Sequence, residues 1–341
     1  MTKARLDLAR EQILGHRRRV GALDQRLPPG AASLERAAWA GLQDSMPRSA
    51  LLSIHARVAD TQPTTWEDPA LVQLWGPRFS AYVVAARDRA IFTLGRLPDD
   101  PKGRQRAEQT ADRLTAFLAD QQMAYGEAGH GQGVFPNSLR YAAPTGRVLM
   151  RWDGARQPTI WMVPPPEMDA GEARLELARR YLHIFGPATA TTFAEWAGIK
   201  APRARAAFDS LARELTAARS PTGEGWILTI DEPSFRDAPA APAAARLLPS
   251  GDAYWLLWGR DRDLLVPDVS RRALLWTPRV WPGALLVNGE IAGTWRRAGA
   301  KVTLEAWRSF SSVERKALEE EAASLPLPGV TGGISVRWID G

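Results

Sequence analysis

The stretch Gly41-Leu-Gln-Asp-Ser-Met-Pro-Arg-Ser-Ala-Leu-Leu-Ser-Ile-His-Ala-Arg-Val58 is a polar elbow that leads directly into an amphipathic segment. Proline is best tolerated in the first turn of a helix, where its missing N–H has no partner to lose, so Pro47 marks a helix start. The apolar side chains that follow share one face at helical spacing. We therefore expect a helix over residues 47–58, with Gln43, Asp44 and Ser45 at its N-terminus.

The polar elbow has two interpretations. A helix N-terminus presents unpaired N–H groups and a partial positive charge, which suit it to positioning a water, a phosphate or a base edge. On that interpretation Gln43, Asp44 and Ser45 are candidate catalytic residues. The second interpretation is structural: Asp44 or Ser45 is an ordinary N-cap, and Gln43 is a surface residue.

Length and hydropathy bound the class of protein. The 341 residues suggest two or three domains of about 100 to 150 residues, and an apolar content of 45% is enough to give each domain a core. No run of about 18 apolar residues is present to span a membrane, and residues 2–19 carry too much charge for a signal peptide. We expect a soluble, cytoplasmic, monomeric protein with no membrane partner.

The cysteine and histidine content argues against a metal or cofactor. The chain has no cysteine, which excludes disulfides, thiolate catalysis and zinc fingers. Its four histidines, His16, His55, His130 and His183, do not have the spacing of metal ligands. We therefore predict no metal and no cofactor.

The charge balance favours a polyanionic partner. The net charge is +6 and the sequence pI is near 9.9, and neutralisation of phosphates by Arg and Lys supplies most non-specific affinity for nucleic acid. Only five of the 44 cationic residues are lysine, so genomic base composition is a second explanation for the excess of arginine. Clustering is the stronger signal, as at Arg17-Arg18-Arg19 and Arg296-Arg297, although a charge run is usually a solvated face.

The N-terminal two thirds of the chain show one pattern three times. Helical spacing over residues 6–27, 33–42 and 47–58 precedes a β-branched and aromatic segment at 71–84, an order typical of a winged helix-turn-helix. The pattern returns as a helix at 106–124 with strands at 148–152 and 159–163. It returns again as helices at 172–185, 189–197 and 202–215 with a strand at 226–230. We predict three winged helices, over residues 1–99, 100–168 and 169–236.

The sequence pattern of the C-terminal third changes from helices to short strands. An alanine- and proline-rich linker over residues 237–245 separates it from the rest, and short strands follow. Asn288-Gly289 between two apolar runs predicts a hairpin, with Trp295 and Arg296-Arg297 at its end. We expect residues 246–341 to form a β-rich, partly closed barrel with one helix over 312–324, so that the whole chain is of the α+β class.

Four segments together resemble the AlkZ/YcaQ-like winged-helix DNA glycosylases of bacteria. Residues 42–52 resemble the family's Gln-x-Gln or Gln-x-Asp elbow followed by Asp-Pro-Arg, and residues 75–84 resemble its Arg-Gly-Thr-Leu-His hairpin. Residues 178–189 are similar to the helix that opens the third winged helix, and residues 285–297 are similar to the C-terminal hairpin. Each segment is weak by itself, but their order and spacing over almost the whole chain are specific.

The resemblance implies three tandem winged helices on a C-terminal β-domain that form a concave basic channel for duplex DNA. It also implies excision of N7-alkylated purines and, in some members, unhooking of interstrand crosslinks. Gln43 occupies the first catalytic position of the elbow, and Ser45 occupies the second, where the family carries Gln or Asp. Tyr82 stands where the family's hairpin carries His.

The chemistry of this reaction follows from the charge of the substrate. Alkylation at N7 makes the purine cationic and a better leaving group, so modest polar groups suffice. Gln43 is placed to hold a water below C1′, and Ser45 extends the hydrogen-bond relay. Asp44 is a third candidate, because a carboxylate facing the sugar stabilises positive charge there.

Several further side chains are candidate DNA contacts. They are Arg17, Arg18 and Arg19, Arg48 in the first turn of a helix, Trp75, Arg78 and Tyr82 of the first hairpin, and Arg296 and Arg297. The alternative for the large aromatic residues is core packing. The alternative for the whole protein is a catalytically inactive winged-helix protein that recognises duplex or damaged DNA.

Overall fold

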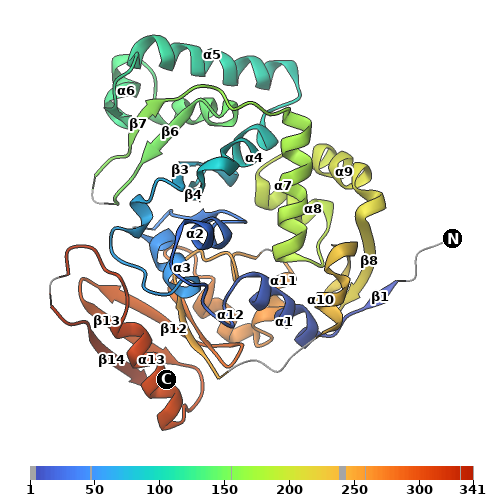
Figure 1. Ribbon diagram of the computed structural model, residues 1–341, viewed down its shortest axis with the longest axis vertical. Coiled ribbons are helices and arrows are strands. Elements are labelled where there is room, and N and C mark those ends of the chain that lie inside the picture. The colour runs from blue at the N-terminus through green and yellow to red at the C-terminus, as the bar shows by residue number, and fades with distance from the viewer. Residues whose placement is uncertain are drawn as a thin grey trace.

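The computed structural model describes residues 5–46, 48–154, 156–237, 243–257, 259–330 and 332–340. These residues form three small three-stranded sheets, each with its own helices, and one five-stranded sheet. Figure 1 shows the second of the three small units at one end of an elongated molecule and the five-stranded sheet at the other. The mixed α+β class agrees with the sequence prediction.

The first unit contains the elbow. Its elements are α1 (Arg10–Val20), α2 (Ala31–Ala37), β2 (Leu42–Gln43), α3 (Ser49–Arg57), β3 (Leu71–Trp75) and β4 (Ala81–Ala85), followed by α4 (Arg89–Thr93). The sheet has the order β2-β4-β3 and is antiparallel. The helix predicted over residues 47–58 is present as α3. Pro47, which was predicted to mark the start of this helix, lies outside the described residues.

The second unit packs two helices against a small sheet. Its elements are α5 (Pro101–Leu118), β5 (Met123–Ala124), α6 (Tyr125–Gly131), a 3-10 segment η5 (Pro136–Thr145), β6 (Val148–Arg151) and β7 (Thr159–Met162). The order is β5-β7-β6. Asp100 caps α5 by accepting the Gly103 N–H, and Pro101 occupies the first turn. Ala111, Leu114 and Leu118 then form the buried face of α5.

The third unit includes the first strand of the chain. Its elements are α7 (Ala170–Phe185), α8 (Ala190–Ala197), α9 (Ala201–Ser210), β8 (Leu215–Ser220), β9 (Gly223–Leu228) and α10 (Glu232–Arg236). Strand β1 (Leu6–Asp7) pairs in parallel with β8, with Leu6 opposite Ala218. The sequence pattern predicts helix from residue 6, whereas the helix α1 begins only at Arg10.

The C-terminal unit is an open sheet. It contains β10 (Ala245–Leu248), α11 (Asp261–Leu265), α12 (Val269–Leu275), β11 (Gly283–Val287), β12 (Glu290–Ala298), β13 (Lys301–Ala306), α13 (Ser312–Ala323) and β14 (Ser335–Asp340). Asn288 and Gly289, both with positive φ, form the predicted hairpin turn between β11 and β12.

The expectation of a partly closed barrel is corrected by the strand order. Strands β10 and β14 are the two edges of the sheet, and among the described residues they do not pair with each other. Strand β14 joins β13 in parallel, which requires a crossover, and α13 supplies it. Helix α13 contacts both β10 and β14 and covers one face of the sheet, as Figure 1 shows.

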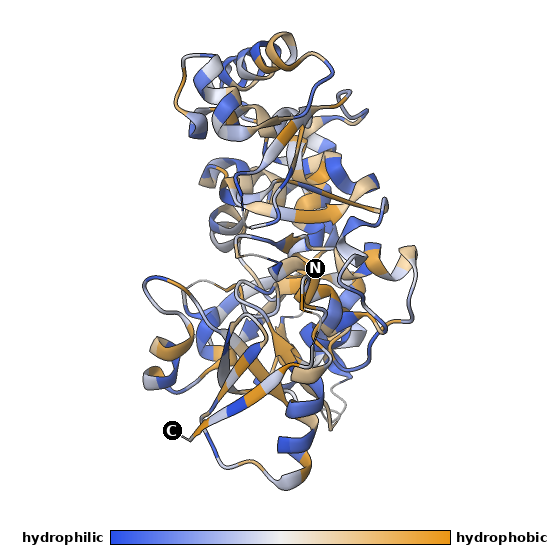
Figure 2. Ribbon diagram, turned by 90° about the vertical axis from the view of Figure 1, so that its left-hand side faces the viewer, coloured by the Kyte–Doolittle hydropathy of each residue, from blue (hydrophilic) through white to orange (hydrophobic). Residues whose placement is uncertain are grey.

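A shared core joins the first, third and C-terminal units. Leu14 of α1, Tyr82 of β4, Trp196 of α8 and Trp255 belong to one buried cluster. Two buried ion pairs cross the same boundaries: Arg57 with Asp252, and Arg180 with Asp88. Figure 2 shows the apolar segments concentrated inside the body of the molecule and hydrophilic turns on its outer helices.

No helix of the described chain has the length and apolarity needed to cross a membrane.

Candidate nucleic-acid interface

The elbow is an edge of the first sheet. Gln43 pairs with Tyr82 across β2 and β4, and the Asp44 N–H donates to the Ala81 carbonyl at 2.8 Å. The chain then turns through Arg48, whose φ is 65°, into α3. This backbone holds Gln43 and Ser45 at the surface.

The Gln43 side chain is half-buried and has partners at both ends of its amide. Its Nε2 donates to Ser45 Oγ at 3.0 Å, and Arg78 Nη2 lies 3.4 Å from its Oε1. A Cβ built on Gly251 would lie 3.5 Å from Gln43 Cδ, so the glycine backbone forms one wall beside the amide. Ser45 is exposed.

Asp44 points the opposite way. Its side chain is 1% exposed, and its carboxylate accepts the Ala50 N–H at 3.0 Å and Gln73 Nε2 at 2.6 Å. Burial raises the pKa of Asp44 to about 6, against the pull of these hydrogen bonds. Gln73 Oε1 in turn accepts the Trp152 N–H at 2.5 Å. Asp44 thus binds α3 to the first sheet and to the β6–β7 hairpin.

The end of β12 lies beside the elbow. Arg296 and Arg297 are exposed at this end, and Arg296 Nη2 donates to the Val280 carbonyl at 3.2 Å. Both arginines line a pocket of about 350 Å³. The remaining lining residues are Met46, Ser49, Leu52, Pro249, Ser250, Val280, Trp281, Pro282, Gly283 and Trp295. Met46 and Ser49, which follow Gln43 and Ser45 in the chain, and the end of β12 therefore line one pocket with both apolar and cationic side chains.

Comparison with known proteins places this arrangement in a family. The profile of the family described as DNA glycosylase AlkZ-like matches residues 36–326. The chain belongs to the AlkZ-like DNA glycosylase family.

Two relatives support the assignment. The interstrand DNA cross-link repair glycosylase of Streptomyces sahachiroi is 28% identical over 180 residues, which cover 51% of this chain and 47% of that protein. The match thus spans about half the length of this curated relative. The structure of Streptomyces sahachiroi DNA glycosylase AlkZ has a TM-score of 0.77 at 17% identity, covering 98% of this chain and 100% of that one. The two proteins share a fold.

Within this AlkZ-like fold, four of the expected DNA contacts are interior residues. Arg17 is 2% exposed, and it donates to the Phe185 carbonyl at 2.5 Å and to the Gly186 carbonyl at 3.2 Å. Arg18 is buried and pairs with Asp24 at 2.8 Å.

Trp75 and Tyr82, 2% and 1% exposed, pack in the cores of the second and first units. Burial corrects the expectation that these four side chains, Arg17, Arg18, Trp75 and Tyr82, contact DNA. It also corrects the hypothesis that the Asp44 carboxylate faces the sugar.

The other expected contacts lie nearer the surface. Arg19 binds α10 through the Ser234 carbonyl at 2.9 Å and Asp237 Oδ2 at 3.1 Å. The guanidinium of Arg48 lies 3.6 Å from the ring centre of Trp66 and donates to the Trp152 carbonyl at 3.2 Å. Of the expected cations, Arg296 and Arg297 are the ones that the structure both exposes and places beside the elbow.

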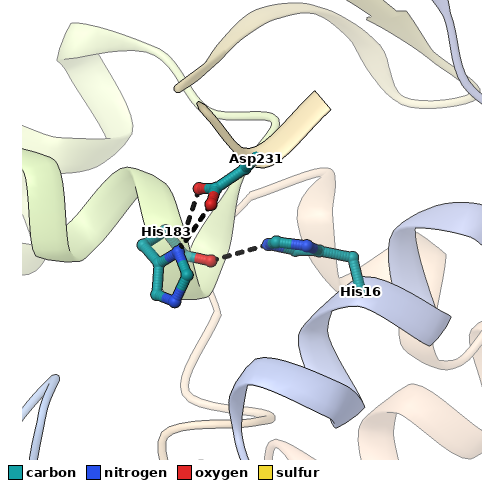
Figure 3. A group of neighbouring side chains, drawn as sticks. All are labelled: His16, His183 and Asp231. Carbon is teal, nitrogen blue, oxygen red and sulfur yellow. Dashed lines mark hydrogen bonds and ion pairs between the residues drawn. The ribbon is translucent and has the colours of Figure 1, made fainter. Parts of the chain in front are cut away.

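A histidine cluster lies away from the elbow. His16, His183 and Asp231 approach one another closely enough to form a ligand set, as Figure 3 shows. His16 Nε2 contacts the His183 carbonyl at 2.8 Å and Nδ1 contacts Ser234 Oγ at 2.9 Å, while burial lowers the pKa of His16 to about 4. His183 Nδ1 lies 2.9 Å from both Asp231 oxygens. Both nitrogens of the neutral His16 ring are thus used to join α1, α7 and α10.

Sequence reasoning missed two groups of residues around the elbow. Gln73 lies in the otherwise apolar strand Leu71–Trp75, and a lone amide in such a run is a signal of a buried polar partner. Met46, Trp281 and Ser250 line the pocket, but they come from separate parts of the chain and carry no common motif.

Proposed function

We propose that this protein is a DNA glycosylase that hydrolyses the N-glycosidic bond of N7-alkylated purines in duplex DNA. The observation that carries the proposal is the half-buried amide of Gln43, held by Ser45 just before Met46, which lines a pocket together with Arg296 and Arg297. The cations suit phosphates of the strand that carries the lesion, and the apolar lining residues suit a bulky adduct.

The proposed chemistry uses the amide and the hydroxyl to hold one water. Gln43 Oε1 has a lone pair for a water hydrogen, and Ser45 Oγ, which accepts from Gln43 Nε2, keeps a second acceptor position. As the bond between C1′ and N9 breaks, its electron pair moves to the purine and neutralises the cationic ring. The held water adds to C1′ and loses a proton to solvent, so proximity supplies most of the rate.

We further propose that the three small units are winged helices and that they align along the duplex. The α8–α9 pair, separated by Gly198, has the form of a helix-turn-helix, and β8 and β9 follow it as a wing. Unhooking of interstrand crosslinks is proposed as the same hydrolysis carried out on a purine whose N7 substituent reaches the other strand. The Streptomyces sahachiroi relative is named as an interstrand DNA cross-link repair glycosylase, which supports this extension.

The test is release of 7-methylguanine from methylated duplex DNA by the purified protein. Gln43→Ala is expected to reduce release to a slow residual rate that single-turnover assays still measure, while leaving a salt-dependent mobility shift with duplex DNA. Gln105→Ala, at an exposed position of α5, is the matched control and should release base at the wild-type rate. Release from Gln43→Ala at the wild-type rate contradicts the role of the amide.

A catalytically inactive DNA-binding protein is the second candidate. Ser45 favours it, because a hydroxyl replaces the longer Gln or Asp side chain of the family's second position. Binding of duplex by the wild-type protein without any base release, on a panel of alkylated oligonucleotides, would decide for this candidate.

A further inference from the structure

Two arginines of the first unit cap the C-terminal end of α8 in the third unit. Arg78 Nη1 donates to the Trp196 carbonyl at 3.0 Å, and Arg96 Nε donates to the Ala197 carbonyl at 3.0 Å. These carbonyls are the unpaired acceptors at the negative end of the helix, which cations stabilise. Arg96 also donates to the Trp75 carbonyl at 3.1 Å, so the hairpin of the first unit is fixed against α8.

The backbone at Arg78 fits closely against the turn that follows α8. Arg78 and Phe79 adopt φ of 55° and 57°, which L residues rarely do. Gly198, with φ of 69°, faces them, and a Cβ there would lie 2.9 Å from Arg78 N. This close approach requires glycine, so the turn between α8 and α9 determines where Arg78 stands.

The second arm of the Arg78 guanidinium reaches the elbow. Its Nη2 lies 3.4 Å from Gln43 Oε1, while Gln43 Nε2 donates to Ser45 Oγ. A primary amide has one accepting and one donating end, and a guanidinium only donates. Arg78 on one side and Ser45 on the other therefore select a single orientation of the amide. Tyr82, behind Gln43, is buried, and burial raises its pKa against the pull of the Arg78 and Arg96 cations.

We propose that Arg78 is a positioning residue for Gln43. Through Arg78, the position of the α8–α9 pair determines the orientation of the Gln43 amide in the elbow. The proposal rests on the proposed glycosylase function for its effect on rate. The guanidinium spans two units: one arm is fixed by the carbonyl of Trp196, and the other sets which end of the Gln43 amide faces the water. A movement of α8 then changes the orientation of the amide without any change in the elbow's own sequence.

The kinetic test is a double-mutant cycle measured as single-turnover excision of 7-methylguanine with enzyme in excess. Arg78→Lys keeps the positive charge but loses the planar guanidinium, whose two arms contact α8 and Gln43. Excision should therefore slow by about 10- to 100-fold. The dissociation constant for duplex should change by less than about twofold, because a cation remains at this position. In a Gln43→Ala background, Arg78→Lys should have no further effect on excision.

The control is Arg246→Lys, another partly buried arginine that donates to backbone carbonyls but lies at β10. It should leave the excision rate and duplex affinity unchanged. Weaker duplex affinity with an unchanged excision rate at saturation would make Arg78 a phosphate contact and overturn the proposal. Equal losses in both backgrounds would overturn it as well.

A second measurement tests the positioning without enzyme activity. The side-chain amide signals of Gln43 in a ¹⁵N-correlated NMR spectrum report its hydrogen bonds. Arg78→Lys should shift them, and Arg246→Lys should not. Unshifted signals in Arg78→Lys overturn the positioning role. Shifted signals in a protein that releases no base would confirm the positioning and show that the glycosylase proposal has failed instead.

Discussion

The run Arg17-Arg18-Arg19 in α1 and the pair Arg296-Arg297 at the end of β12 have the same chemistry in the sequence and opposite places in the structure. Helix α1 is packed between α7 and α10, so the arginines of α1 bind carbonyls and carboxylates of the protein itself. The last residues of β12 project beside a pocket and remain exposed. A basic run is thus a candidate DNA contact only where neighbouring elements leave it uncovered. Four predictions sharpen this contrast.

The largest effect is expected from Arg17→Ala. The change leaves two carbonyls at the end of α7 without their donor and removes a buried side chain, so the free energy of unfolding should fall by about 3 kcal/mol. Urea denaturation measures it. Arg36→Ala, at an exposed position of α2, is the control and should cost less than about 0.5 kcal/mol. An equally small loss for Arg17→Ala would mean that Arg17 is not structural.

The same contrast between inward and outward side chains exists inside the elbow, at Asp44. Its folded pKa, about 6, lies above the ordinary value of 3.8, so the folded state binds the proton more tightly than the unfolded state. Stability from this proton is fully present below pH 3.8 and is lost as the pH rises through 6. Between pH 4.5 and 7 the free energy of unfolding of the wild type should fall by about 2 kcal/mol relative to that of Asp44→Asn, as measured by urea denaturation. A constant difference between the two proteins would contradict the burial of the carboxyl group.

Substitution of the exposed pair Arg296 and Arg297 should weaken DNA binding and leave stability nearly unchanged, which is the opposite of the effect expected for Arg17→Ala. Under the proposed function, changing both Arg296 and Arg297 to Ala should weaken duplex binding by about 10-fold at physiological salt. The slope of log affinity against log salt should decrease by about 2, which corresponds to two lost phosphate contacts. Titrations at several salt concentrations measure both. Unfolding should change by less than about 0.5 kcal/mol, and an unchanged salt slope would remove these residues from the interface.

The smallest effect is expected from Ser45→Ala. The variant loses the hydroxyl that accepts from Gln43 Nε2, but Arg78 still contacts Oε1. Single-turnover excision should slow by only about threefold, in line with the loss of one weak hydrogen bond. A loss as large as that of Gln43→Ala would make the hydroxyl an equal partner in the chemistry.

Elements with local signals were predictable from the sequence. Thr189 caps α8 and Gly198 ends it in the left-handed conformation, and helices were expected on both sides of that turn. The Asn288-Gly289 hairpin is a signal of the same kind. The two-residue strands β1 and β2 were not predicted, because their only support is pairing with strands far along the chain.

The candidate site divides in the same way. The sequence located the elbow and the β12 arginines, since each lies within a short motif. It did not distinguish Asp44 from its neighbours Gln43 and Ser45, because the direction of each side chain depends on the Gln73 amide and on the β6–β7 hairpin. The open C-terminal sheet was also missed, since no local pattern shows that β14 joins β13 in parallel.

The pairing of β1 with β8 also affects the order of events during synthesis. Leu6 and Asp7 emerge from the ribosome before the whole of the first and second units, yet their partners Ala218 and Arg219 belong to the third. Until then Leu6, Leu8 and Ile13, which are buried in the finished protein, have no apolar surface from that unit to cover them. The N-terminal segment can therefore complete its native packing only after the third unit has been synthesised.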